Sequence, residues 1–146
     1  LYERQADRLY RLAHARLLNA ADAEDAVAET FAKYLRKMPE FRDASHEKAW
    51  FLRVCINTCN DLARRRTVRA YTPLEELSEV LAAQEKDKSV LESVYALPEK
   101  YRMCVLLYYF EDFSVEETAK ALKISVSAVK MRLSRAREML KTVLAQ

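Results

Sequence analysis

Side chains that can bind nucleic acid are concentrated in residues 125–140, SVSAVKMRLSRAREML. Drawn as a helix, this stretch has an apolar row on one side, made of Val129, Leu133, Ala136, Leu140 and, further along, Val143. The opposite side carries Ser127, Met131, Ser134, Arg135 and Glu138, with Lys130 and Arg137 on one shoulder and Arg132 on the other. Such a helix can pack by its apolar row and enter a DNA major groove with its opposite side.

The basic side chains of this stretch differ in what they can reach. Lys130 and Arg135 have the reach for guanine edges or phosphates, whereas Arg132 and Arg137 are better placed for phosphates. An ordinary surface helix is the alternative, because cations near the end of a helix also complement the helix dipole.

A second surface of this kind is predicted on a helix over residues 46–66. One side of this helix is apolar, with Leu52, Cys55, Ile56, Cys59 and Ala63. The other side carries Trp50, Val54, Asn57, Asp61 and Arg64. Asparagine can read base edges and aromatic rings can stack on or wedge bases, so this side can bind DNA. The alternative is that Trp50 belongs to the hydrophobic core and that the arginines at 64–66 form a solvated helix end.

Other reactive side chains have spacings that favour structural roles. Cys55 and Cys59 are one helical turn apart on the apolar side, and with Cys104 they make an odd count that is typical of buried thiols. His14 and His46 are far apart in sequence and no Cys-x-x-Cys pair occurs, so we expect no metal site. The chain has no glycine, which excludes a glycine-rich phosphate loop. We therefore expect no cofactor and no catalytic activity.

The elements that position these residues are predicted to be helices throughout. Absence of glycine and only three prolines among 146 residues argue against glycine-rich sheet turns. Helices are expected over residues 3–18, from Asp22 as cap to the residue before Pro39, after Ser45 as cap, and from about Ser89 to the residue before Pro98. The second of these carries Val27, Phe31, Leu35 and Met38. The fold class is all-α, with two small helical domains over 1–68 and 89–146 joined by a linker over 69–88.

A helix-turn-helix is predicted in the second domain. A nearly all-apolar helix over 98–110 precedes it. Ser114 and Glu117 form a capping box for a short helix that ends near Leu122, Lys123 lies in a tight turn, and Ser125 caps the last helix. In the linker, Thr72–Glu75 is a good helix start, and Leu74, Leu77 and Leu81 give it a narrow apolar face.

Charge is distributed unevenly, although the net charge is only +3. Residues 48–69 hold six basic side chains and one acidic side chain. Residues 123–141 also hold six basic side chains and one acidic side chain. The intervening residues 72–92 hold six acidic and two basic side chains. Two basic zones separated by an acidic one indicate two surfaces that face a polyanion. No apolar run approaches the ~20 residues of a membrane span and no signal peptide is visible, so a cytoplasmic protein is expected.

Three stretches, in this order, resemble bacterial RNA polymerase sigma factors of the extracytoplasmic-function (ECF) class. AEDAVAETF resembles the motif that binds core polymerase, and AWFLRVCINTCNDLARRR resembles the promoter-melting helix. LPEKYRMCVLLYYFEDFSVEETAKALKISVSAVKMRLSRAREML resembles the domain that reads the −35 element. The resemblance covers nearly the whole chain and leaves the linker poorly matched.

The resemblance implies a role for each matching position. Core polymerase would be bound through Asp25, Ala28, Glu29 and Lys33, with Asp25 and Glu29 on the clamp helices of the largest subunit. The −10 element would be melted and a flipped base captured by Phe41, Arg42, Asp43, Ser45, Trp50, Arg53, Asn57, Asp61, Arg64 and Arg65. The −35 element would be contacted by Ser127, Ala128, Lys130, Met131, Arg132, Ser134, Arg135 and Arg137. Flipping a base costs a few kcal/mol, which stacking and polar contacts can offset.

The chain departs from the family pattern at three places. Ala28 stands where glutamine is frequent, Ser127-Ala128 replaces a common Gly-Thr, and Lys123 stands where the turn usually has glycine. A positive φ at Lys123 would cost about 1 kcal/mol.

The resemblance also implies partners: core RNA polymerase, promoter DNA as duplex and melted non-template strand, and an anti-sigma factor. Such an anti-sigma factor is often membrane-anchored and would hold this chain at the membrane. The leucine face at 74–81 could dock this partner or pack on the chain's own domains.

Two other classes of protein compete with this interpretation. A conventional transcription regulator would use the C-terminal helix-turn-helix alone and bind duplex DNA as a dimer, but it leaves AEDAVAETF and the Trp50 helix without purpose. An enzyme would need a nucleophile–base pair or a metal cluster, and acidic residues such as Asp22, Glu24 and Asp25 are typical of a helix start instead.

Overall fold

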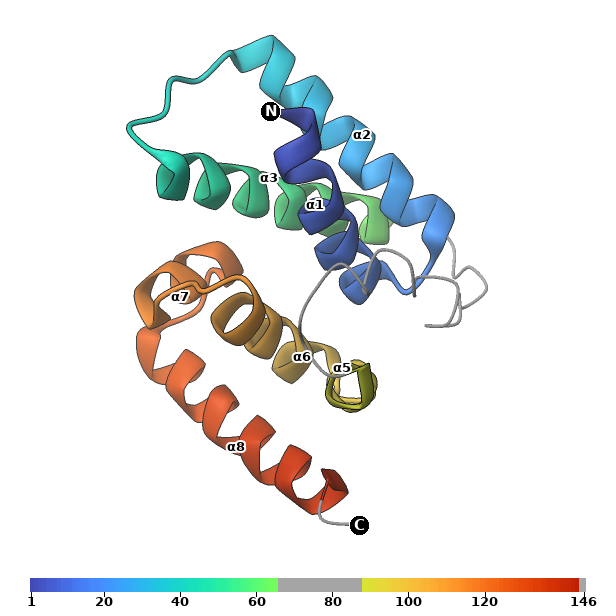
Figure 1. The fold of residues 1–146 in the computed structure, drawn as a ribbon, viewed down its shortest axis with the longest axis vertical. Helices are drawn as coiled ribbons and strands as arrows, with labels where there is room; N and C mark the ends of the chain where they lie inside the picture. The colour runs from blue at the N-terminus through green and yellow to red at the C-terminus, as the bar shows by residue number, and fades with distance from the viewer. Residues whose placement is uncertain (66–87, 145–146) are drawn as a thin grey trace. The chain divides into compact units, whose positions relative to one another are not determined.

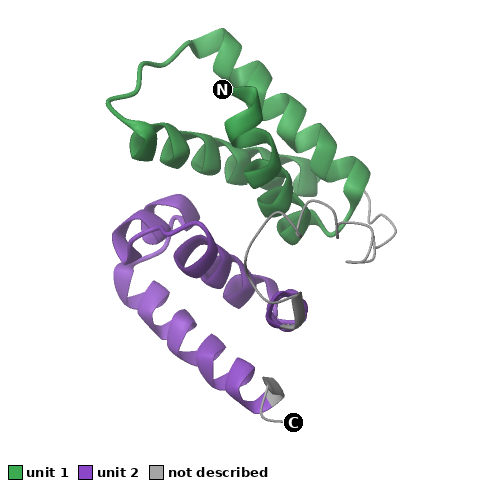
Figure 2. Ribbon diagram, viewed as in Figure 1, with its two compact units in different colours: residues 1–73 green, residues 74–146 purple. Residues whose placement is uncertain are grey.

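The computed structural model describes residues 1–65 and 88–144. For residues 88–89 and 143–144 it describes the backbone alone. Every regular element in residues 1–65 and 88–144 is helical, which confirms the all-α prediction (Figure 1). The predicted linker lies outside the described residues apart from Lys88, as do Arg66 and the leucines at 74, 77 and 81. The chain divides into two compact units, Leu1–Pro73 and Leu74–Gln146 (Figure 2).

The N-terminal unit is built from α1 (Tyr2–Leu17), α2 (Ala20–Lys37) and α3 (Ala44–Arg65), each of which packs on the other two. Its hydrophobic core combines large side chains with small ones: Leu9, Leu12, Ala13, Ala15, Ala23, Ala26, Val27, Phe51, Leu52, Cys55, Ile56 and Cys59. The alanines let the helix backbones approach closely, and Phe51 packs against Phe31, Tyr34, Phe41 and Trp50.

The starts of α2 and α3 differ from the predicted ones. Asn19, and not Asp22, caps α2: its Oδ1 accepts the Asp22 backbone N–H at 3.0 Å, while Asp22 itself is buried in the first turn. Asp43, and not Ser45, caps α3, because its Oδ1 accepts the His46 backbone N–H at 2.8 Å. Any Ser, Asn or Asp near a helix start can cap it, and the backbone conformation decides which one does.

Three side chains predicted to be apolar-face residues are exposed. Leu35 and Met38, at the end of α2, are 67% and 63% exposed, and Ala63, near the end of α3, is also exposed. Leu35 and Ala63 lie in the last turns of their helices, and Met38 is the residue that caps the end of α2. Conversely, Thr58 is buried on α3, where its hydroxyl donates to the Val54 carbonyl at 2.8 Å.

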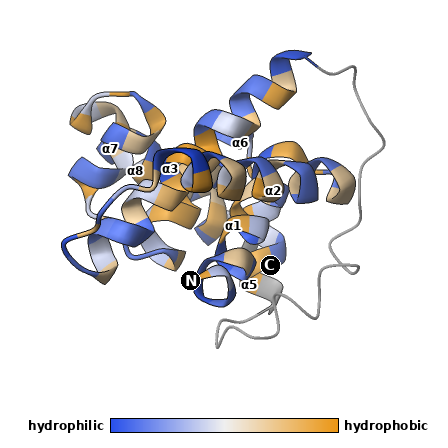
Figure 3. Ribbon diagram, turned by 90° about the horizontal axis from the view of Figure 1, so that it is seen from above, coloured by the Kyte–Doolittle hydropathy of each residue, from blue (hydrophilic) through white to orange (hydrophobic). Residues whose placement is uncertain are grey.

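The C-terminal unit contains α5 (Lys88–Tyr95), α6 (Glu99–Val105), η2 (Leu106–Phe110), α7 (Val115–Leu122) and α8 (Val126–Leu144). The helix predicted over 98–110 is therefore divided into an α-helix and a π-helical segment, η2. Met103, Cys104, Val105 and Leu107 from this stretch are buried, as are Val129, Leu133 and Ala136 of α8, and α6 packs on α8. Hydrophobic and hydrophilic residues alternate along the helices, as amphipathic packing requires (Figure 3).

The helix-turn-helix forms with the predicted caps. Ser114 Oγ accepts the Glu117 backbone N–H at 3.0 Å, and Glu117 Oε1 accepts the Ser114 backbone N–H at 2.9 Å, so the capping box before α7 is complete. Lys123 ends α7 with φ 59°, and Ser125 Oγ accepts the Ala128 backbone N–H at 3.0 Å at the start of α8. α8 therefore follows α7 after a single tight turn, and the two helices pack on each other.

The lack of glycine has a visible consequence at helix ends. Leu18, Met38 and Lys123 each take the left-handed conformation that ends a helix, with φ of 55°, 44° and 59°. Glycine normally occupies such positions because a Cβ atom makes the conformation less favourable by roughly 1 kcal/mol. In each case the cap N–H donates to the carbonyl four residues earlier, which satisfies a helix-end acceptor.

None of the helices within residues 1–65 and 88–144 has the length and apolar content that crossing a membrane requires. Within the same ranges, no group of three or more His, Cys, Asp or Glu side chains is arranged to hold a metal ion.

Candidate nucleic-acid interfaces

The exposed face of α8 is the first candidate interface. Val129, Leu133 and Ala136 are at most 3% exposed and fix the helix to the C-terminal unit. The predicted −35 residues lie on the remaining surface: Ser127, Lys130, Met131, Ser134, Arg135 and Arg137 are exposed, and Ala128 and Arg132 are half-buried. Met131 is 48% exposed, so a large apolar side chain stands in the middle of a polar and basic face. An apolar side chain in such a place can contact a thymine methyl group.

Tyrosine side chains on neighbouring elements hold two of the α8 arginines. Arg137 Nη1 donates to the Tyr109 hydroxyl at 2.6 Å. Arg135 hydrogen-bonds the buried Tyr101, and this contact, together with nearby Lys100, lowers the pKa of the phenol. Both tyrosines precede α7 in sequence and cannot be found by drawing α8 alone. They limit the side-chain freedom that each arginine loses when it binds DNA.

The π-helical segment η2 sets the position of Tyr109. The extra residue per turn places Tyr109 at the surface, 37% exposed, while Leu106 and Leu107 are buried. Tyr108 packs edge-on against its ring, with centroids 4.9 Å apart. Single π-helical turns are frequent at functional sites.

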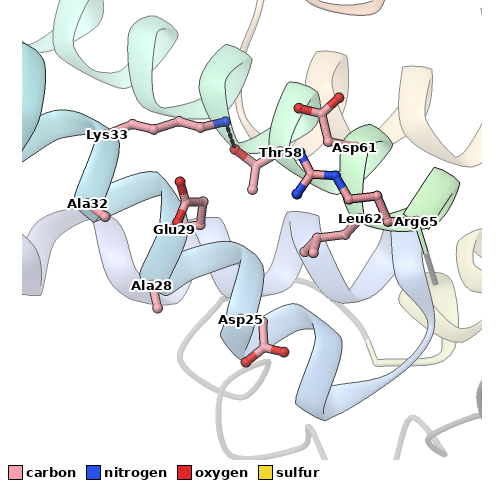
Figure 4. A pocket seen from close by; sticks show the side chains of 9 residues that line it. All are labelled: Asp25, Ala28, Glu29, Ala32, Lys33, Thr58, Asp61, Leu62 and Arg65. Carbon is pink, nitrogen blue, oxygen red and sulfur yellow. Dashed lines mark hydrogen bonds between the residues drawn. The ribbon is translucent and has the colours of Figure 1, made fainter.

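A groove of about 590 Å³ between α2 and α3 is the second candidate interface (Figure 4). Its lining from α2 is Asp25, Ala28, Glu29, Ala32 and Lys33, and its lining from α3 is Thr58, Asp61, Leu62 and Arg65. The structure therefore brings all four predicted polymerase-binding residues together with two residues predicted for the −10 element. Ala28 leaves the middle of this α2 surface without a long side chain.

Three charged side chains that line this groove, Glu29, Lys33 and Asp61, have hydrogen-bond or ion-pair partners. Lys33 extends across to α3, where its ammonium donates to Thr58 Oγ1 at 2.8 Å (Figure 4). Glu29 pairs with Arg36 along α2 at 3.0 Å, and Asp61 pairs with Arg64 along α3. Lys33 thus ties α2 to α3, a contact that the sequence did not predict.

An aromatic cluster supports the residues predicted to open DNA. Trp50 is half-buried, and its ring lies 6.1 Å from Tyr34, 5.9 Å from Phe41 and 5.0 Å from Phe51, measured between centroids. It is therefore neither a fully exposed base-stacking residue nor a fully buried core residue. Phe41 also stacks on Tyr34 with centroids 6.3 Å apart, so the loop before α3 is anchored on α2.

The remaining −10 candidates lie along α3 and in the loop before it. Arg53, Asn57 and Asp61 are half-buried on α3, and Arg64 and Arg65 are exposed at its end. Arg42 and Asp43 are exposed in the loop, and Ser45 is exposed in the first turn of α3. His46, for which the sequence pattern predicted no role, contacts Arg42 and Asp43 of this loop.

The cysteines behave as buried thiols, as predicted. Cys55, Cys59 and Cys104 are free and buried, and Cys55 Sγ donates to the Leu9 carbonyl at 3.7 Å. A hydrogen bond with Cys55, followed by burial, raises the pKa of the Cys59 thiol. Burial likewise raises the pKa of Cys104, against the opposing effect of Arg132. The thiols of Cys59 and Cys104 therefore stay protonated at neutral pH.

Comparison with known proteins gives the family. The model "Sigma-70 region 2" matches residues 1–69, and "Sigma-70, region 4" matches residues 88–140. The chain is 31% identical over 140 residues to RNA polymerase sigma factor SigV of Bacillus subtilis, across 94% of this chain and 84% of that protein. It is 29% identical over 147 residues to ECF RNA polymerase sigma factor SigM of Mycobacterium tuberculosis, across 99% of this chain and 75% of that protein.

Two solved structures also resemble this chain. CnrH, in complex with the cytosolic domain of CnrY, is 26% identical with a TM-score of 0.65, across 99% of this chain and 84% of that chain. The sigma factor RpoE of Bartonella quintana, in complex with the anti-sigma factor NepR, has a TM-score of 0.71 across 99% of this chain and 98% of that chain. At 21% identity, the second likeness shows the fold alone.

The chain belongs to the sigma-70 family of transcription initiation factors. Within that family it is an alternative sigma factor of the ECF class, which directs promoter-specific transcription by RNA polymerase.

Proposed function

We propose that residues 1–68 bind core RNA polymerase and open the −10 element, that residues 69–88 link the two domains, and that residues 89–146 read the −35 element. The observation that carries this proposal is the separation of two different candidate surfaces between the two units. One is the basic, exposed face of α8. The other is the α2–α3 groove with the adjoining aromatic loop.

In the −35 surface, Arg135 and Lys130 contact base edges and phosphates, Arg132 and Arg137 contact phosphates, and Met131 lies against the base edges. The exposure of these side chains, together with the tyrosine contacts that hold Arg135 and Arg137, supports this assignment. Bidentate arginine–guanine contacts discriminate by about 1–3 kcal/mol per base pair.

In the −10 surface, Phe41, Arg42, Asp43 and Ser45 receive a base flipped from the non-template strand, and Asn57 and Asp61 contribute polar contacts. Trp50 supports this loop through its contacts with Phe41 and Phe51. Arg53, Arg64 and Arg65 bind the backbone of the opened strand. Unstacking the base costs a few kcal/mol, which ring contacts with the aromatic cluster can offset.

Core polymerase binds along α2 through Asp25, Ala28, Glu29 and Lys33. Asp25 and Glu29 offer carboxylates to basic groups of the polymerase clamp, and the small Ala28 and Ala32 permit close approach of a helix backbone. The chain performs no catalysis in this scheme, because the polymerase makes the phosphodiester bonds.

An anti-sigma factor is proposed as the inhibitory partner, and the protein is proposed to act in the cytoplasm, held at the membrane when that partner is membrane-anchored. CnrH, whose structure resembles this chain, was solved in complex with the cytosolic domain of CnrY. That likeness supports a partner that covers one or both of the surfaces described above.

Transcription with purified core polymerase tests the proposal. Multi-round transcription on fragments of the source genome, with 5′-end sequencing, should reveal start sites that appear only when this protein is added. These starts should share two upstream sequence elements. If core polymerase gains no start site while the protein alone shifts duplex DNA, a conventional helix-turn-helix regulator is the better account.

A further inference from the structure

His46 connects to the loop before α3 through its backbone and its side chain. The backbone N–H of His46 donates to Asp43 Oδ1 at 2.8 Å, which caps the helix. In the reverse direction, the backbone N–H of Arg42 donates to the His46 Nδ1 at 3.1 Å. Two hydrogen bonds in opposite directions therefore fix the loop to the first turn of α3.

The imidazole ring of His46 also contacts Phe41. The two rings meet edge-on, with centroids 5.4 Å apart and an interplanar angle of 88°. Phe41 continues this contact to Trp50 and Tyr34. His46 is thus the polar end of the aromatic cluster, and it holds both the backbone at Arg42 and the side chain at Phe41.

Loop residues have no helical partner for their backbone N–H groups, so a side-chain acceptor decides which loop conformation is favoured. Nδ1 accepts a hydrogen bond here, which means that the neutral ring carries its proton on Nε2. A loop that is already held in one conformation loses less entropy when it binds its target.

We propose that His46 is a positioning residue, whose Nδ1 and ring edge hold Phe41 and Arg42 in the loop conformation that captures the flipped −10 base. This inference rests on the proposed function, in which that loop receives the base. His46 itself need not contact DNA, because its effect passes through the Arg42 amide and the Phe41 ring.

Three substitutions separate the two contacts. In His46→Asn, Oδ1 stands at the same number of bonds from the backbone as Nδ1 and can accept the Arg42 N–H, but the ring is lost. In His46→Phe, the edge-on ring contact with Phe41 remains, but the acceptor is lost. His46→Ala removes both contacts.

The first readout is hydrogen exchange of the Arg42 backbone amide in the full chain, followed by NMR without DNA. The amide should be similarly protected in the wild type and His46→Asn. It should exchange roughly tenfold faster in His46→Phe and His46→Ala, because its acceptor is gone. Equal exchange in wild type and His46→Phe would overturn the proposal, since Nδ1 would then not hold the loop.

The second readout is the rate of open-complex formation by the holoenzyme at a promoter found by 5′-end mapping. His46→Phe should open the promoter about fivefold more slowly, as expected for one lost hydrogen bond, and His46→Asn should restore the rate to within about twofold. A general loss of stability would slow both variants alike, so rescue by asparagine distinguishes positioning from folding. Equal rates for His46→Phe and wild type would overturn the inference.

Phe41→Ala separates failure of this inference from failure of the proposed function. If Phe41→Ala slows opening but His46→Phe does not, the loop captures the base and His46 does not position it. If Phe41→Ala also opens the promoter at the wild-type rate, the loop is not the base-capturing site, and both the proposed −10 surface and the role of His46 are wrong.

Discussion

In the C-terminal unit the candidate surface lies on one helix, α8, whereas in the N-terminal unit it is assembled from α2, α3 and the loop that joins them. The α8 surface depends on a cap at Ser125 and an apolar row from Val129 to Ala136. The N-terminal surface depends on contacts between residues distant in sequence, such as Lys33 with Thr58. Apart from the tyrosine contacts of Arg135 and Arg137, the first surface should therefore tolerate perturbation elsewhere in its unit better than the second.

The largest effect is expected from the residue that anchors the N-terminal aromatic cluster. Phe51 is fully buried and contacts Phe31, Tyr34, Phe41 and Trp50. Phe51→Ala should lower the free energy of unfolding by about 3–5 kcal/mol. Urea unfolding followed by the fluorescence of Trp50, the single tryptophan, measures this loss. Leu35→Ala is the matched control, because Leu35 is exposed and its loss should change stability by less than about 0.5 kcal/mol.

A somewhat smaller effect is expected on the C-terminal surface, and it should be confined to binding. Arg135→Ala should weaken holoenzyme binding to a promoter by about 1–3 kcal/mol, and Arg135→Lys should recover only part of this, because lysine cannot make a bidentate contact. Competition binding on promoters with and without the −35 element measures the loss. An equal loss on DNA that lacks the element would show that Arg135 acts without reading sequence.

Substitutions of Lys33 and Thr58 separate two roles of Lys33: the hydrogen bond that joins α2 to α3 and the proposed contact with polymerase. Lys33→Met and Thr58→Val should each destabilise the N-terminal unit by about 1 kcal/mol, and the double variant should lose less than the sum. A double-mutant cycle from urea unfolding gives the coupling. In parallel, titration with core polymerase separates the roles: only Lys33→Met should weaken binding if Lys33 also contacts the polymerase, as proposed above.

A substitution in the turn of the helix-turn-helix should stabilise the C-terminal unit. Lys123 has φ 59°, where glycine is more favourable, so Lys123→Gly should stabilise the C-terminal unit by up to about 1 kcal/mol. Lys120→Gly, inside α7, is the control and should destabilise it by about 1 kcal/mol. Thermal unfolding by circular dichroism compares the two. Destabilisation by both substitutions would mean that the Lys123 side chain makes a contact worth more than the backbone strain.

The smallest effect concerns the contact between the starts of α1 and α3. Burial favours the neutral form of Glu47, but hydrogen bonds from Gln5 at 2.8 Å and from Arg4 outweigh it and lower the pKa of this carboxyl. Because the folded-state pKa lies below the unfolded one, the stabilisation is present at neutral pH and is lost as pH falls through the folded-state pKa. Glu47→Gln should cost under about 1 kcal/mol at pH 7 and nothing in acid. Urea unfolding at both pH values tests this, and a loss that persists in acid would contradict it.

The C-terminal surface could be predicted from sequence because its determinants are local. Ser114, Glu117 and Ser125 define the caps, and the spacing of Val129, Leu133 and Ala136 defines which side of α8 is buried. The tyrosines at 101 and 109 could not be predicted, since their contacts with α8 depend on how α6 and η2 pack on it.

For the N-terminal surface, the sequence predicted which residues take part but not how they contact one another. Family resemblance selected the residues, yet it did not indicate that Lys33 crosses to Thr58 or that Trp50 is half-buried in an aromatic cluster. The sequence does not distinguish Asn19 and Asp43 as the caps, because several capping residues stand close together at each helix start. The signal for His46 was its position three residues after Asp43, where a side chain can reach back to the loop.

The central claim is that two separate surfaces of this sigma factor read two separate promoter elements. The most direct test measures open-complex formation for wild type, Phe41→Ala and Arg135→Ala on promoters mutated in the −10 or the −35 element. We predict that Phe41→Ala has its effect only while the −10 element is intact, and Arg135→Ala only while the −35 element is intact. If each variant lowers the rate by the same factor on every promoter, neither surface reads the element assigned to it, and the claim is contradicted.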